Sequence, residues 1–164
     1  MKTLLILRHA KSSWGNASLS DFERPLNKRG KYDAPRMGKL LRQEDLIPDL
    51  IVSSAANRAL TTARLVADEV DCPQPIVATR DFYHASPDEY IAYLQGVPDE
   101  NQSVMVVGHN PGMEDLVTQL GGGYEVMPTA ALAQFELDIA SWRDFDAVTV
   151  GELMGVWRPK EINN

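Results

Sequence analysis

The dipeptide Arg8-His9 has the residue types and the position to do phosphate chemistry. It follows the apolar run at residues 4–7, which is typical of a short buried strand. In open α/β sheets, ligands bind at the carboxyl ends of the strands. Arginine offers a planar fork for phosphate oxygens, and histidine offers a nitrogen that can attack, bind or shuttle protons. The dipeptide therefore indicates a phosphate site at the end of the first strand.

Two further strand ends carry matching residues. The apolar run at 50–53 is followed by Arg58, and the run at 103–107 is followed by Gly108 and His109. If these strands are parallel neighbours, two arginines and two histidines converge on one crevice bordered by positive helix N-termini. Two isolated histidines do not have metal-ligand spacing, so we expect a metal-independent site with no cofactor.

Strands and helices that could position these residues alternate along the chain. We expect a three-layer α/β/α sandwich with a mostly parallel central sheet and no large helical lid. Asn27, Ser54 and the capping box that begins at Ser86 are expected to start helices, and the glycines at 121–123 to end one. The strands are expected at 4–7, 50–53, 76–78, 103–107, 132–137 and 148–157, and the helices at 28–44, 55–70, 87–94 and 113–120.

Composition limits the class of protein. The 164 residues are predicted to form one domain, 1–164, with a net charge of −7, which disfavours nucleic acid and anionic membrane as partners. Residues 1–64 carry 12 Lys/Arg against 6 Asp/Glu, whereas residues 65–164 carry 4 against 17. The single cysteine, Cys72, excludes an internal disulfide, and no signal peptide or membrane span is evident. We therefore expect a cytoplasmic protein.

Five segments together resemble the histidine phosphatase (phosphoglycerate mutase-like) superfamily, and within it the short SixA-type phosphohistidine phosphatases. They span nearly the whole chain. They are Arg8-His9 with Ser12 and Trp14; Arg24-Pro25-Leu26 with Arg29-Gly30; Ser53-Ser54 with Arg58-Ala59 and Thr62-Ala63; Val107-Gly108-His109-Asn110-Pro111; and Pro128-Thr129-Ala130-Ala131.

The resemblance implies a role for each site residue. His9 would attack phosphorus in line and form a phosphohistidine intermediate, while its other ring nitrogen donates to a backbone carbonyl. Arg8, Arg58 and His109 would hold the equatorial oxygens and offset their charge. Ser12 is a further candidate donor to phosphate.

Two departures from the superfamily pattern bear on the mechanism. Ala10 stands where the superfamily usually has glycine, which is compatible with a negative φ, and Lys11 replaces a common Glu or Gln. The larger members' acidic proton donor has its nearest match by position in Asp81, with His84 as an alternative. A third alternative is that no donor is needed, because a protonated phosphoramidate nitrogen is already a good leaving group.

The predicted substrate is a phosphorylated protein or a small phosphorylated compound. Only about two dozen residues separate 78 from 103, where larger members place a lid, so we expect an open site that suits phosphohistidine on a signal-transduction protein. The alternatives are a small phosphomonoester such as a sugar or nucleotide phosphate, or a phosphate-binding module without turnover. A mutase, which needs a closed site, fits less well. No oligomeric state is predicted.

Overall fold

A six-stranded sheet forms the centre of the protein. The computed structural model describes residues 1–121 and 123–162. The strand order is β3-β2-β4-β1-β5-β6, in which β3, β2, β4 and β1 run parallel, β5 pairs antiparallel with β1, and β6 pairs antiparallel with β5. Only β5 therefore runs against the other five strands. The mostly parallel sheet is therefore confirmed. The strands are β1 (Lys2–Arg8), β2 (Leu50–Ser54), β3 (Val77–Thr79), β4 (Ser103–Gly108), β5 (Leu132–Leu137) and β6 (Gly151–Trp157).

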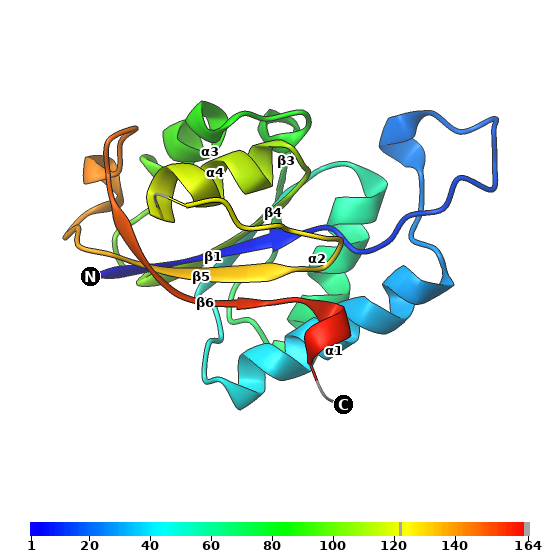
Figure 1. Ribbon diagram of the computed structural model, residues 1–164, viewed down its shortest axis with the longest axis horizontal. Coiled ribbons are helices and arrows are strands. Elements are labelled where there is room, and N and C mark those ends of the chain that lie inside the picture. Colours follow the sequence, from blue (N-terminus) through cyan, green and yellow to red (C-terminus); the bar gives the residue numbers. More distant parts are fainter. Residues whose placement is uncertain (122, 163–164) are drawn as a thin grey trace.

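Helices cover both faces of the sheet, which confirms the three-layer sandwich (Figure 1). Strand β1 shows why, since its side chains alternate between the faces. Leu4 and Ile6 pack toward α3 and α4, whereas Leu5 and Leu7 pack toward α1 and α2. All four are fully buried, and each such leucine or isoleucine stabilises the fold by roughly 2 kcal/mol. The helices are α1 (Lys28–Gln43), α2 (Asn57–Val70), α3 (Pro87–Leu94) and α4 (Gly112–Gly121).

Two of the three predicted helix caps are confirmed. The Asn27 side chain accepts a hydrogen bond from the Gly30 N–H at 2.9 Å, and the capping box at Ser86 is present. The prediction for Ser54 was wrong, because β2 continues through Ser54 and the N-cap of α2 is Ala56. The Ser54 hydroxyl accepts a hydrogen bond from the Ala56 N–H at 3.2 Å, and its other partner is Nε2 of His109, directly after β4.

The remaining differences lie at element ends. The last strand begins at Gly151 rather than at 148, and the short strand is Val77–Thr79 rather than 76–78. The predicted glycine stop at 121–123 includes residue 122, which lies outside the described residues. The long loop after β1 contains a 3-10 turn, η1 (Asp21–Glu23). None of the helices in the described ranges is long and apolar enough to cross a membrane.

Candidate active site

The parallel register brings the predicted strand ends together. Arg8 at the end of β1 is the register partner of Gly108 at the end of β4, so His9 and His109 occupy equivalent next positions. Their ring centroids lie 5.1 Å apart. Strand β4 lies between β1 and β2, and Arg58 is the second residue of α2, the helix that follows β2. The predicted convergence of two arginines and two histidines is present in the structure.

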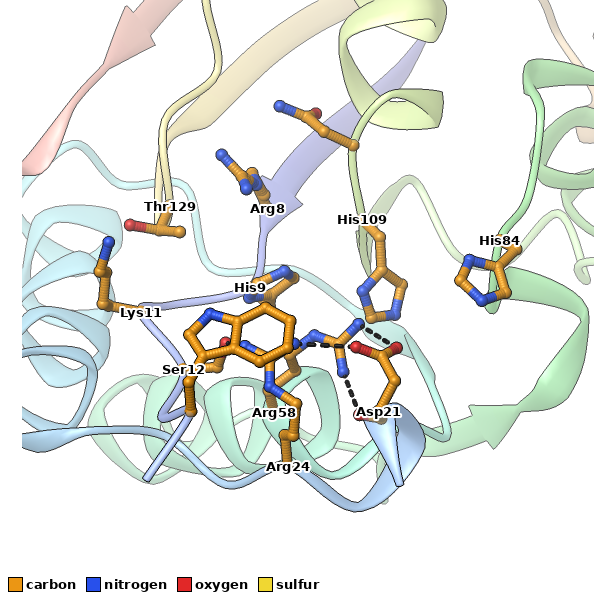
Figure 2. A pocket seen from close by; sticks show the side chains of 12 residues that line it. Arg8, His9, Lys11, Ser12, Asp21, Arg24, Arg58, His84, His109 and Thr129 are labelled. Carbon is orange, nitrogen blue, oxygen red and sulfur yellow. Dashed lines mark hydrogen bonds and ion pairs between the residues drawn. The ribbon is translucent and has the colours of Figure 1, made fainter. Parts of the chain in front are cut away.

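These residues line a cavity of about 460 Å³ (Figure 2). Of the residues singled out from the sequence, all line it except Asp81. Four cationic side chains face this space against a single carboxylate. The lining residues are Arg8, His9, Lys11, Ser12, Trp14, Asp21, Arg24, Arg58, His84, His109, Asn110 and Thr129.

His9 is held as a neutral imidazole with one free nitrogen. Its Nδ1 lies 2.7 Å from the Ala10 carbonyl oxygen, which only accepts, so Nδ1 carries the proton and Nε2 keeps its lone pair. Burial, helped by the charges of Arg8 and Arg58, lowers the pKa of His9 to about 4. A neutral Nε2 surrounded by cations is suited to nucleophilic attack on an anion.

His109 has the opposite arrangement of ring nitrogens. Its Nε2 lies 2.8 Å from Ser54 Oγ, which already accepts from the Ala56 N–H. In the tautomer in which the Ser54 hydroxyl donates to Nε2, the ring proton of His109 lies on Nδ1. This Nδ1 is buried without a hydrogen-bond partner among the described residues. Burial also lowers the pKa of His109 to about 3. In that tautomer, His109 offers an unused N–H donor beside His9.

Arg58 and Arg24 are joined by a carboxylate that the sequence did not suggest. Arg58 donates through Nη2 to Asp21 Oδ2 at 3.0 Å and through Nη1 to the Asp21 carbonyl at 2.6 Å. Arg24 donates to Asp21 Oδ1 at 2.8 Å, and the Tyr83 hydroxyl donates to Oδ2 at 2.6 Å. The bond from Tyr83, followed by those from the arginines, holds the pKa of Asp21 well below its usual range. Asp21 is thus a permanent anion that orients two guanidinium groups.

Arg8 lies at the opposite wall of the pocket. Its Nη1 donates to the Met127 carbonyl at 3.1 Å, and the Asn110 amide donates to the same oxygen at 2.9 Å. Arg8 Nε and Asn110 Oδ1 are buried without hydrogen-bond partners within residues 1–121 and 123–162. Unpaired buried polar atoms are costly, so their concentration here favours a polar ligand at this wall.

Ser12 belongs to the support of Arg24. Its hydroxyl oxygen accepts a hydrogen bond from Arg24 Nη2, and the Ser13 carbonyl accepts from Arg24 Nε at 3.1 Å. The Arg24 guanidinium also lies 3.3 Å from the ring centroid of Trp14, a side chain that is 78% exposed. Because Ser12 uses a lone pair for Arg24, its own proton stays available for a phosphate oxygen.

The structure does not bring Asp81 to the pocket. Asp81 lies on the 3-10 turn η2 (Arg80–Phe82), is exposed, and uses its N–H to donate to Thr79 Oγ1 at 3.1 Å. The chain reaches the pocket only three residues later, at His84, which lines it with a positive φ of 57°. Strained backbone of this kind is concentrated at functional sites. The geometry therefore favours His84 over Asp81 as a proton donor.

Local packing explains two features of the sequence motifs. Positive φ at non-glycine residues of the described chain occurs at four positions that do not include Ala10, so alanine fits there without strain. The Ala10 N–H donates to Thr62 Oγ1 at 3.0 Å, which ties this loop to α2. A Cβ on Gly30 would come within 2.1 Å of the Lys11 carbonyl, so the close approach of α1 to the loop requires glycine.

Sequence reasoning missed several lining residues. Arg24 and Trp14 were noted within motifs but given no role, and Asp21 carried no signal because an acid in an anion site is unexpected. Their common feature is the long polar loop after β1, a length that is often functional.

Comparisons with known proteins agree with this geometry. The sequence profile of the histidine phosphatase superfamily (branch 1) matches residues 4–83. An uncharacterized chloroplastic protein of Arabidopsis thaliana is 31% identical over 158 residues, which cover 90% of this chain and 72% of that protein. A 2,3-bisphosphoglycerate-dependent phosphoglycerate mutase of Mycobacterium leprae is 38% identical over 71 residues, but these are only 42% of this chain and 29% of the mutase.

Solved structures resemble nearly the whole chain. The protein histidine phosphatase SixA complexed with tungstate matches with a TM-score of 0.82 and 25% identity over 96% of this chain and 97% of that one. A SixA-type protein from Agrobacterium tumefaciens matches with a TM-score of 0.79 and 30% identity over 96% of this chain and 98% of that one. By sequence and by fold, this chain belongs to the histidine phosphatase superfamily, among its SixA-like phosphatases.

Proposed function

We propose that the protein hydrolyses phosphohistidine on a protein substrate through a phosphohistidine intermediate at His9. The observation that carries this proposal is the state of His9. Its Nδ1–H is fixed on the Ala10 carbonyl, and its unprotonated Nε2 faces a pocket of cations. A buried nucleophile of depressed pKa next to a ready-made anion site is suited to covalent phosphoryl transfer.

In the first step, Nε2 of His9 attacks phosphorus and the bond to the substrate nitrogen breaks. The substrate imidazole departs as a neutral ring when its distal nitrogen is already protonated, so no protein acid is required. Arg8, Arg58 and the Nδ1–H of His109 hold the equatorial oxygens of the transferring group. Asp21 keeps the Arg58 guanidinium in place while the phosphoryl group is transferred.

In the second step, water attacks phosphorus and the bond to Nε2 breaks. His9 regains its lone pair. The proton of the attacking water goes to a phosphate oxygen when the substrate is phosphohistidine, and to His84 when His84 has already given a proton to an alcohol leaving group. For an alcohol leaving group, we propose that His84 first donates a proton to the departing oxygen. Each residue then ends the cycle in its starting state.

The choice of a protein substrate is supported by the short segment between β3 and β4. It contains only η2 and the eight-residue helix α3, so no helical lid covers the pocket there. Likeness to SixA, a protein histidine phosphatase, supports the same choice. The second candidate is a small phosphomonoester, which the partial match to a phosphoglycerate mutase favours.

The test is isolation of the phosphoenzyme. We expect ³²P transfer from a phosphohistidine protein to give a label that is acid-labile and alkali-stable, and that is absent from His9→Ala. Competition between a phosphohistidine protein and a panel of small phosphomonoesters then ranks the substrates. Faster turnover of a small ester would assign the second candidate, and binding of phosphate with no label from any donor would indicate a binding module.

A further inference from the structure

A second cavity, of about 480 Å³, adjoins the phosphate pocket. Arg8, Lys11 and Thr129 line both cavities, so they form the wall between them. We call the second cavity the basic groove. It is lined by Arg8, Lys11, Arg29, Pro128, Thr129, Arg158, Pro159, Lys160 and Glu161.

The basic groove concentrates positive charge on a protein that is acidic as a whole. Five of its nine lining residues are cations and one, Glu161, is an acid, whereas the chain carries a net charge of −7. Three distant segments supply these cations: the end of β1 with the loop after it, the first turn of α1, and the chain from Arg158 into the 3-10 turn η4 (Pro159–Glu161). The catalytic mechanism uses only Arg8 among them.

The cations divide into paired and unpaired groups. Arg158 is held by Glu125 at 3.0 Å and by Glu161 at 3.2 Å, so it forms part of the framework. Lys11 and Lys160 are exposed and have no ion pair with any residue of the described chain. These two ammonium groups are therefore available to a ligand whose phosphate occupies the adjoining phosphate pocket.

We propose that the basic groove binds acidic side chains that flank the phosphorylated residue of a polypeptide substrate. This inference rests on the proposed function and specifies its substrate class. A subsite for a small metabolite is built from buried polar groups converging on one point. Exposed lysines on the rim of an interface instead guide and orient a macromolecule of opposite charge. The unpaired lysines of the basic groove are of the second kind.

The experiment compares two phosphohistidine peptides of equal length, one flanked by Asp and Glu and the other by Asn and Gln. The readout is the ratio of kcat/KM for the acidic peptide to that for the neutral peptide, which does not depend on the fraction of active enzyme. We expect the ratio to exceed one for the wild type at low salt. Lys160→Glu should lower it about three- to tenfold, and 0.5 M salt should reduce the difference. Lys39→Glu makes the same charge change on an exposed part of α1 outside the groove, and should leave the ratio unchanged.

Two results would overturn the inference: equal rates for both peptides, or equal loss in Lys160→Glu and Lys39→Glu. A Lys160→Glu defect confined to small compounds with a second anionic group would reassign the groove to metabolites. Failure of the proposed function looks different, because the wild type would then hydrolyse neither phosphohistidine peptide. In that event the affinities of the wild type and Lys160→Glu for the two peptides, measured by titration without turnover, decide the inference: the acidic peptide should bind the wild type more tightly than the neutral peptide does, and Lys160→Glu should lose this difference.

Discussion

The two sides of the phosphate pocket are built by different means. The strand-end side consists of residues that end a strand of the sheet or directly follow one, namely Arg8, His9 and His109. The loop side consists of residues from connections, namely Asp21, Arg24 and His84. His9 and His109 are buried, as is Arg24 on the loop side, whereas the Asp21 side chain is 41% exposed. The comparison indicates that the sheet register brings the two histidines together, whereas two separate loops hold the Arg24 guanidinium and bring Asp21 and His84 to the pocket.

The largest expected effect is loss of the nucleophile on the strand-end side. His9→Ala should lower kcat by at least about 10⁴-fold, because it removes the nucleophile of the proposed covalent intermediate. Ser12→Ala, which removes a hydroxyl from the loop, should cost no more than about tenfold. Rates of p-nitrophenyl phosphate hydrolysis, with circular dichroism to verify folding, measure both. Similar losses in the two variants would contradict the division between the sides.

The next effect concerns proton donation from the loop side. His84→Gln should lower the rate for alcohol leaving groups by about 10²-fold and remove the basic limb of the pH–rate profile. Asp81→Asn is the matched control and should leave the profile unchanged, because Asp81 lies outside the pocket. A lost basic limb in Asp81→Asn, with a normal profile in His84→Gln, would restore Asp81 as the donor.

The third effect is on stability and belongs to the strand-end side. The folded pKa of His9 is about 4 and that of His109 about 3, both below the ordinary value of 6.5. Below pH 6.5 the two histidines therefore bind protons in the unfolded chain but stay unprotonated in the folded one. The free energy of unfolding consequently decreases as the pH is lowered. Each histidine should remove about 2 kcal/mol of unfolding free energy between pH 7 and pH 5. Urea unfolding at several pH values measures this, and His9→Gln should roughly halve the slope; an unchanged slope would show that His9 is not buried as a neutral ring.

The smallest effect tests the carboxylate of the loop side. Asp21→Asn removes the anion that orients Arg58 and Arg24 and adds one net positive charge to the pocket. We expect kcat to fall about tenfold and the inhibition constant of inorganic phosphate to fall about threefold. Tyr83→Phe removes one hydrogen bond but keeps the carboxylate, so it serves as the control. An unchanged kcat in Asp21→Asn would show that the Asp21 carboxylate does not contribute to catalysis.

Much of the strand-end side was predictable because its signals are local. Apolar runs at 4–7 and 103–107 predict buried parallel strands, and parallel neighbours present the residues that follow them at one edge. The same patterns predict the sandwich of helices and sheet. Helix starts were less certain: the cap at Asn27 is confirmed, but Ser54 completes β2 and bonds to His109 instead.

The sequence by itself determined the order of strands and helices, the residues that follow the strands, and the family to which those motifs belong. Only the tertiary structure decided that Asp21 lies between Arg24 and Arg58, and that His84 rather than Asp81 reaches the pocket. The physical reason is the range of the interactions. Strand and helix patterns repeat over a few residues, whereas the contact of Arg58 with Asp21 joins positions 37 residues apart and exists only after the loop has closed over the edge of the sheet.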